Sequence, residues 1–190
     1  VFDVAIGNPP FGSNTITDKA KARAHLSGMK VHNYVIAKTA MHLRPGGVMA
    51  MVVTHRFLDT ADAEARAVLS KDFAFLGAVR LPNDAFKANA GTEVTTDIIF
   101  LQKLPESDWN SKAAIADGKR WVGVTTVSDP QGKGEVALNQ YFADNMGMML
   151  GVWGKFGTMY GPDQPALVAR PGQDTAAMMA RAVAALPEGK

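Results

Sequence analysis

Cysteine is missing from this sequence of 190 residues. Its absence excludes disulfide bridges, thiolate zinc sites and cysteine nucleophiles, and it fits a reducing compartment such as the cytoplasm. No apolar run approaches the ~18 residues that a membrane-spanning helix needs, and no basic stretch with an apolar core and a cleavage site opens the sequence. With 47% apolar and 20% charged residues, we expect a compact domain outside the membrane.

A large excess of charge of one sign is also missing. The formal net charge is +2, so no overall field points to a nucleic-acid partner. Residues 1–103 nevertheless hold 12 basic and 9 acidic side chains and all four histidines, whereas residues 104–190 hold 8 basic and 9 acidic ones. The histidines follow no usual ligand spacing, so no metal site is predicted. A polar segment with Lys19, Lys21, Arg23 and Lys30 is either a solvated surface or a track for a DNA backbone.

Apolar runs that alternate with helix-forming segments predict an α/β fold for residues 1–103. We expect a buried strand at 2–6, helices at 18–26, 33–43 and 61–69, and strands at 48–53, 73–81 and 95–103. Pro45-Gly46-Gly47 should end the helix at 33–43, and Asp59 or Thr60 should cap the helix at 61–69. Continuously apolar strands are typical of a mostly parallel sheet that is covered on both faces.

The pattern weakens after Lys103, and we place a boundary there. Residues 104–190 are expected to form a small α+β extension with strands at 121–127 and 166–170 and helices at 138–145 and 174–186. At the other end, Val1 opens directly into an apolar run. We therefore expect the chain to be a piece of a longer protein whose missing N-terminal part holds some of the active site.

The motif with the clearest chemistry is Asn8-Pro9-Pro10-Phe11, which follows the strand at 2–6. In an open α/β sheet, ligands collect at the carboxyl ends of the strands. An amine conjugated to an aromatic ring is a poor nucleophile, and the Asn8 side-chain oxygen and the Pro9 carbonyl could accept its two hydrogens and favour a pyramidal nitrogen. Phe11 offers a flat face on which an extruded base could stack, worth about 1 to 3 kcal/mol. The arrangement suits methylation of a planar nitrogen.

The run from Phe2 to Gly12 resembles the catalytic motif of S-adenosylmethionine-dependent amino-methyltransferases, above all the adenine-N6 DNA methyltransferases. The segments 33–47, 48–55, 75–82 and 91–103 are similar to the following helix and strands of that family, in the same order. The resemblance covers residues 1 to about 103, and it includes methylase subunits of restriction systems and large proteins that fuse a methylase to a helicase. It implies the second half of a Rossmann-like sheet, in which parallel strands are followed by an antiparallel hairpin.

The resemblance also implies roles for the matching residues. Asn8 and Pro9 would bind the target amine, Pro10 would shape the loop near the methyl donor, and Phe11 would stack on a flipped adenine. The loop at 88–96, with Thr95 and Thr96, would lie on the substrate side. His55 and Arg56, at the end of the strand at 48–53, either contact a phosphate or base there or belong to a solvated loop.

The family's glycine-rich loop for S-adenosylmethionine normally precedes this motif, and we expect it to lie upstream of Val1. Gly132 and Gly134 do not follow a strand and open a helix, as a donor site requires. Three interpretations stay open. The chain is the catalytic-motif part of a DNA adenine-N6 methyltransferase, or a related enzyme acting on RNA adenine or protein glutamine, or a nucleic-acid-binding module without activity of its own.

Overall fold

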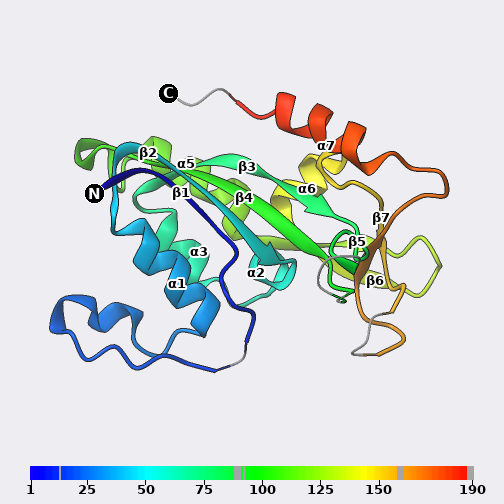
Figure 1. Ribbon diagram of the computed structural model, residues 1–190, viewed down its shortest axis with the longest axis horizontal. Helices are drawn as coiled ribbons and strands as arrows, with labels where there is room; N and C mark the ends of the chain where they lie inside the picture. Colours follow the sequence, from blue (N-terminus) through cyan, green and yellow to red (C-terminus); the bar gives the residue numbers. More distant parts are fainter. Residues whose placement is uncertain (13, 88–90, 92, 158–160, 188–190) are drawn as a thin grey trace.

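The computed structural model describes residues 1–12, 14–87, 91, 93–157 and 161–187. Its centre is a four-stranded sheet with the order β1-β2-β4-β3 (Figure 1). The strands are β1 (Phe2–Gly7), β2 (Leu43–Thr54), β3 (Phe73–Leu81) and β4 (Thr96–Lys103). Within the described residues no helix is both long and apolar enough to span a membrane.

The sheet is mixed. β1 pairs with β2 in parallel, whereas β4 pairs antiparallel with both β2 and β3. Strands β1, β2 and β3 therefore run in one direction, and β4 returns between β2 and β3. This arrangement confirms the predicted α/β class and the antiparallel hairpin, and it puts the ends of β1, β2 and β3 and the start of β4 at one edge of the sheet.

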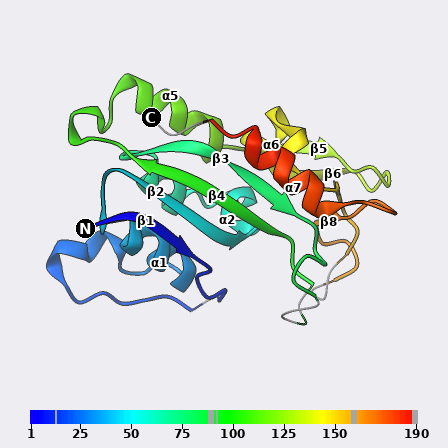
Figure 2. The ribbon, with the colours of Figure 1, turned by 45° about the horizontal axis from the view of Figure 1, so that its top comes forward.

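One face of the sheet carries the core. Met49, Met51 and Val53 alternate along β2 and are at most 4% exposed, because they pack against α1 (Val31–Ala40) and α3 (Glu64–Leu69). The other face is covered over β3 and β4 by α7 (Thr175–Ala184), as Figures 1 and 2 show.

The strand expected at 2–6 forms, but it is not buried. Phe2, Val4 and Ile6 share one face of β1 and are 64%, 57% and 82% exposed. Their side chains stay open because β1 is an edge strand and α7 packs over β3 and β4. On the opposite face Ala5 reaches the core.

Several local predictions were wrong, two of them at helices that flank the sheet strands. The helix expected at 33–43 ends at Ala40, and Pro45-Gly46-Gly47 lies inside β2, where the pairing with β1 jumps from Phe2↔Leu43 to Val4↔Val48. The helix expected at 61–69 begins only at Glu64, after a separate short helix α2 (Arg56–Asp59). Asp59 is the last residue of α2 and caps nothing, because its buried carboxylate binds other groups.

Residues 104–187 form a smaller α+β part that packs on the sheet. The elements in this part are η2 (Glu106–Asp108), α5 (Lys112–Val122), β5 (Val124–Ser128), β6 (Glu135–Asn139), α6 (Gln140–Asp144), η3 (Met146–Met148), β7 (Val152–Gly154), β8 (Ala166–Val168) and α7. β5 pairs with β6 and β7 pairs with β8. Trp121, Phe142 and Trp153 join the same apolar core as the β2 side chains.

Candidate active site

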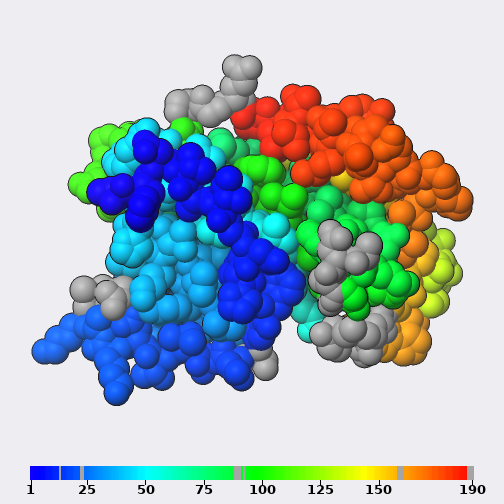
Figure 3. Space-filling model, in the orientation of Figure 1, coloured from blue at the N-terminus to red at the C-terminus, as the bar shows by residue number. Residues whose placement is uncertain are grey.

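Asn8-Pro9-Pro10-Phe11 leaves the sheet at the end of β1, as the sequence predicted. The ladder with β2 ends at Gly7↔Met51, and the two prolines that follow cannot donate to a ladder. Pro9 is buried and anchors the loop, whereas Asn8 and Pro10 are exposed and the Phe11 ring is 43% exposed. The amide of Asn8 and the face of Phe11 are thus available to a ligand, and Figure 3 shows the N-terminal segment on the surface.

The second predicted group assembles at the same edge of the sheet. β2 continues three residues beyond Met51 to Thr54, which pairs with Thr96. The His55 amide then donates to the Thr95 carbonyl at 3.1 Å. The structure therefore brings together His55, Arg56, Thr95 and Thr96, which lie about forty residues apart in the sequence.

These four residues differ in what they can offer a substrate. Arg56 is exposed, and its Nη2 donates to Gln164 Oε1 at 3.5 Å. The His55 side chain is 13% exposed. Thr95 and Thr96 are buried, and the Thr95 hydroxyl already accepts from the Leu167 amide at 2.9 Å. Residues 88–90 and 92 of the loop expected on the substrate side lie outside the described part of the chain.

A buried ion network beneath this edge was missed by the sequence analysis. Arg80 Nε donates to Asp97 Oδ1 at 2.7 Å, and Nη2 donates to Asp97 Oδ2 at 2.8 Å and to Asp59 Oδ1 at 3.0 Å. The other Asp59 oxygen lies 3.2 Å from His55 Nδ1. Arg80 and Asp97 are each fully buried, so the His55 ring is the end of the network that reaches the surface.

The charged groups in this network shift one another's pKa. Burial alone would raise the pKa of the Asp59 carboxyl, but the Arg80 guanidinium and the His55 hydrogen bond lower it below its ordinary value. Burial raises the pKa of Asp97 even though Arg80 opposes the shift. Burial would lower the pKa of Arg80, but the two carboxylates raise it. Arg80 is therefore a permanent buried cation that holds both acids.

The network also joins the sheet to residues 104–187. The Arg80 guanidinium lies between the rings of Phe142 and Trp153, with its carbon 4.3 and 4.5 Å from their centroids. The backbone amide of Asn139 donates to Asp59 Oδ1 at 2.9 Å. A sequence signal for this network did exist. Arg80 and Asp97 are each a charged residue within an apolar strand, and they lie opposite each other in the β3–β4 ladder.

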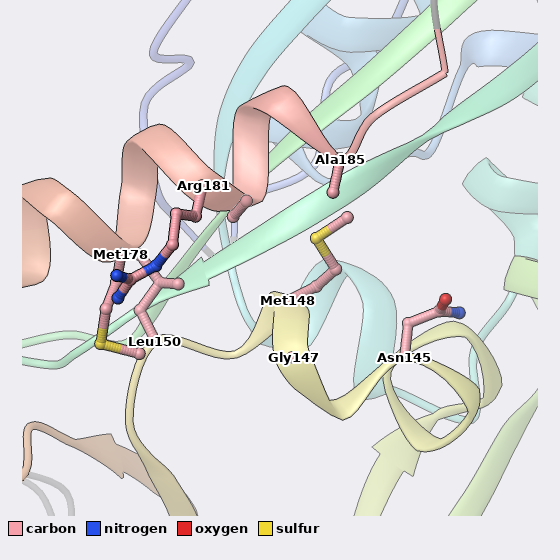
Figure 4. A pocket seen from close by; sticks show the side chains of 8 residues that line it. Asn145, Gly147, Met148, Leu150, Met178, Arg181 and Ala185 are labelled. Atoms are coloured by element: carbon pink, nitrogen blue, oxygen red, sulfur yellow. The ribbon is translucent and has the colours of Figure 1, made fainter.

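Two hollows of the surface lie away from these residues. A hollow of ≈ 310 Å³ between η3 and α7 is lined by Met148, Leu150, Met178 and Ala182, with Asn145 and Arg181 at its rim (Figure 4). A second hollow, of ≈ 450 Å³, lies between Leu81 and Met179. None of the predicted site residues lines either hollow, so we assign no ligand to them.

The glycines at 132 and 134 do not form a loop for the donor, S-adenosylmethionine. Gly132 and Gly134 belong to the turn between β5 and β6, where the Asp129 carboxylate accepts from the amides of Gln131 and Lys133. This turn is closed by its own hydrogen bonds and leads into a strand. A donor loop has to lead into a helix. In the described part of the chain, no group of three or more His, Asp and Glu side chains could hold a metal ion.

Comparison with known proteins finds methylases that are similar to part of this chain. Residues 1–86 match the family model described as Eco57I restriction-modification methylase. The Defense against restriction protein B of Escherichia phage P1 is 33% identical over 108 residues, which are 55% of this chain and 5% of that protein. The chain thus spans about one twentieth of the length of this curated relative. The N-terminal part of the chain is similar to restriction-modification methylases.

Solved structures of similar fold include two methyltransferases. One is a putative class I S-adenosylmethionine-dependent methyltransferase from Listeria monocytogenes, which is 24% identical and has a TM-score of 0.44. The matched region covers 55% of this chain and 32% of the Listeria chain. The other is the M protein of the type I restriction enzyme EcoKI, which is 14% identical and has a TM-score of 0.48. The matched region covers 96% of this chain and 47% of the M protein chain.

Proposed function

We propose that this chain is the catalytic-motif part of a DNA adenine-N6 methyltransferase that uses S-adenosylmethionine. The observation that carries the proposal is the placement of Asn8-Pro9-Pro10-Phe11. The tetrapeptide lies at the carboxyl end of β1, with Asn8 and Phe11 exposed, inside the residues that match a restriction-modification methylase. The carboxyl ends of parallel strands are where α/β sheets bind their ligands.

Each residue of the motif has its own role in binding the adenine that accepts the methyl group. The Asn8 side-chain oxygen and the Pro9 carbonyl accept the two hydrogens of the adenine amine, which directs the lone pair away from the ring system. Phe11 stacks on the base once it has left the duplex. Pro9 is buried and Pro10 has a fixed φ, so the acceptors keep their directions without reorganising.

The methyl donor is held by another part of a longer protein in this proposal. Two observations support that division. The described residues contain no glycine-rich loop that opens a helix, and β1 leaves a free edge next to the exposed Phe2, Val4 and Ile6 side chains. An apolar edge strand is a site for further strand pairing. A donor-binding segment paired with β1 would lie beside Asn8.

His55 and Arg56 are proposed to contact DNA at the same edge of the sheet. The buried Thr95 and Thr96 are proposed to support that edge from the interior of the protein. Arg56 is exposed and can reach a phosphate, whereas the buried Thr95 hydroxyl holds β8. The hydrogen bond from the Arg56 guanidinium to Gln164 brings residues of the extension to this side as well.

The test is methyl transfer by a longer polypeptide that contains this chain, with Asn8→Ala compared with the wild type. We expect N6-methyladenine in duplex DNA and a loss of more than about 100-fold in rate for the variant, since removing one preorganised hydrogen-bonding group that stabilises a transition state costs about that much. Gln131→Ala, which removes an exposed side-chain amide in the turn between β5 and β6, is the matched control. Methylation that survives Asn8→Ala within tenfold would overturn the role of Asn8, and a product on RNA or glutamine would overturn the substrate.

A further inference from the structure

Positive charge is concentrated in the segment that follows the motif. Residues 12–42 contain five basic side chains, Lys19, Lys21, Arg23, Lys30 and Lys38, and one acidic side chain, Asp18. This segment therefore has a formal charge of +4, whereas the whole chain has +2. The rest of the molecule has a formal charge of −2, so the excess of positive charge lies in this segment.

The first part of this segment is an ordered loop that closes on itself. Thr15 forms an antiparallel bridge with Lys30, and the Val31 amide donates to the Asn14 carbonyl at 2.8 Å. Between these ends lies the short 3-10 helix η1 (Lys21–Leu26). Leu26 and Met29 are 1% and 3% exposed and pack on Ala37 of α1. We call residues 14–30 the basic loop.

The basic loop presents its lysines to solvent. Lys19, Lys21 and Lys30 are exposed, and among the described residues none of the three forms an ion pair. Asp18 binds the Tyr34 hydroxyl at 2.8 Å and the Ala20 amide at 2.9 Å, so its carboxylate is directed into the loop. Buried Leu26 and Met29 hold the loop in place, which fixes the charges on the surface.

We propose that the basic loop binds the phosphate backbone of DNA beside the nucleotide whose base enters the Asn8–Phe11 site. This inference rests on the proposed function for the identity of the polyanion. The loop begins three residues after Phe11, a span of at most about 10 Å of chain. One strand of DNA carries a phosphate for every 3.4 Å or so of helix axis. A base held at Asn8 therefore brings its neighbouring phosphates to the start of the loop.

In Figure 3 the blue segment that continues from the N-terminal residues extends along the lower rim of the molecule. This rim is continuous with the edge at which β1 ends. A backbone that passes the motif can thus follow the basic loop over several phosphates. Lysine ammonium groups suit this use, because they contact phosphate as point charges and tolerate any sequence.

The experiment measures the salt dependence of DNA binding by this chain. Fluorescence anisotropy with a labelled duplex at about 50 to 200 mM salt gives the slope of log Kd against log salt. We expect the variant Lys19→Gln/Lys21→Gln/Lys30→Gln to reduce that slope by about 2 to 3 units, since each lost phosphate contact removes about 0.9. Affinity should fall in the same way for duplexes of unrelated sequence.

The matched control is Lys71→Gln/Lys112→Gln/Lys119→Gln, which removes the same charge from three exposed lysines. Lys71 precedes β3, and α5 meets the start of β3 through the Asp117 carboxylate and the Phe75 amide, so these lysines lie at the opposite edge of the sheet. We expect the wild-type slope for this control. Equal slopes for the two triple variants, or no DNA binding by the wild type, would overturn the inference.

Two further measurements separate this inference from the proposed function. If the slope changes as expected but a longer polypeptide forms no methyladenine, the proposed function fails and the basic loop remains a DNA-binding surface. If Asn8→Ala abolishes methylation but the slope does not depend on the basic loop, the inference fails alone. Binding to phosphatidylserine vesicles without binding to duplex DNA would replace DNA by a membrane surface as the partner and overturn the proposal.

Discussion

Arg80 is the residue on which the interior of the molecule depends most. Its guanidinium neutralises Asp59 and Asp97 in a site where all three are at most 8% exposed. Removing one member of a buried ion network costs about 3 to 5 kcal/mol, because the partner charge stays buried without compensation. We therefore expect Asp97→Asn to lower the free energy of unfolding by about 3 kcal/mol, measured by urea denaturation.

A paired substitution separates the charge from the packing. Arg80→Leu/Asp97→Leu removes the ion pair between positions 80 and 97, and apolar replacements of buried ion pairs are often tolerated. Asp59 keeps the hydrogen bond from the Asn139 backbone amide. We expect the double variant to be less destabilised than the sum of its single variants. Asp163→Asn, at a side chain that is 70% exposed, is the control and should change stability by less than about 0.5 kcal/mol. Additive losses at positions 80 and 97 would contradict the coupling.

His32 gives the stability of the protein a pH dependence. Burial next to Phe57, followed by the nearby Lys30 charge, lowers its pKa below the ordinary value of 6.5. The unfolded chain then binds the proton more tightly than the folded chain, so stability present above pH 6.5 is lost as the pH falls below that value. We expect His32→Gln to lose less stability than the wild type between about pH 7.5 and about pH 5.5.

Thermal unfolding at the two pH values measures this difference directly. His25→Gln, at an exposed histidine, is the control for the loss of one imidazole. Equal losses in the wild type and in His32→Gln would show that another group causes the pH dependence.

At the scale of the elements, β1 is an edge strand that pairs on one side, with β2, in the described sheet. Its exposed Phe2, Val4 and Ile6 side chains and its free edge form a template for pairing with another chain. We expect Val4→Lys/Ile6→Lys to reduce self-association, measured by light scattering against protein concentration, with a change in stability below about 1 kcal/mol.

The matched control adds the same two charges at other exposed apolar residues. Ile115 on α5 is 53% exposed and Val183 on α7 is 43% exposed, and Ile115→Lys/Val183→Lys should leave the light scattering as in the wild type. If both variants lowered association equally, net charge rather than the edge of β1 would be the cause.

The elements show how far a sequence can be interpreted without a structure. β3 and β4 form within one residue of the expected bounds, because their apolar runs are long and their ends carry turn residues. The burial expected for β1 was wrong, since burial depends on what lies beside a strand rather than on its own composition. The place of Asn8-Pro9-Pro10-Phe11 at a strand end followed from local pattern, and its chemical role stays a prediction.

Local pattern marks Arg80 and Asp97 as charged residues within apolar strands, but it does not show which groups pair in the ion network. Asp59 was expected to cap a helix, since the residues around it contain no hint of Arg80 or Asn139, which are 21 and 80 positions away. Only the register of the β3–β4 ladder and the packing of β6 on α2 bring these groups together. Contacts of that kind depend on tertiary arrangement, which the periodicity of single segments does not contain.

At the scale of the whole molecule, the packing bears on the boundary expected near residue 104. One apolar core contains Met49, Phe75 and Ile99 from the sheet together with Trp121 and Phe142 from the extension. The Phe75 ring stacks on Trp121 with centroids 4.8 Å apart. Because neither part can lose the other without exposing this core, we expect residues 1–103 and 104–190 to unfold together.

Two probes test this expectation in a single denaturation series. All three tryptophans lie in residues 104–190, so their fluorescence follows the extension, whereas far-ultraviolet circular dichroism follows the helices and strands of both parts. Coincident midpoints indicate one cooperative unit. A fluorescence midpoint at lower denaturant would mean that the extension opens first and that the sheet is stable without it. In that case Asp97→Asn should move the fluorescence midpoint further than the dichroism midpoint, because the network ties Asp59 and Arg80 to Asn139, Phe142 and Trp153.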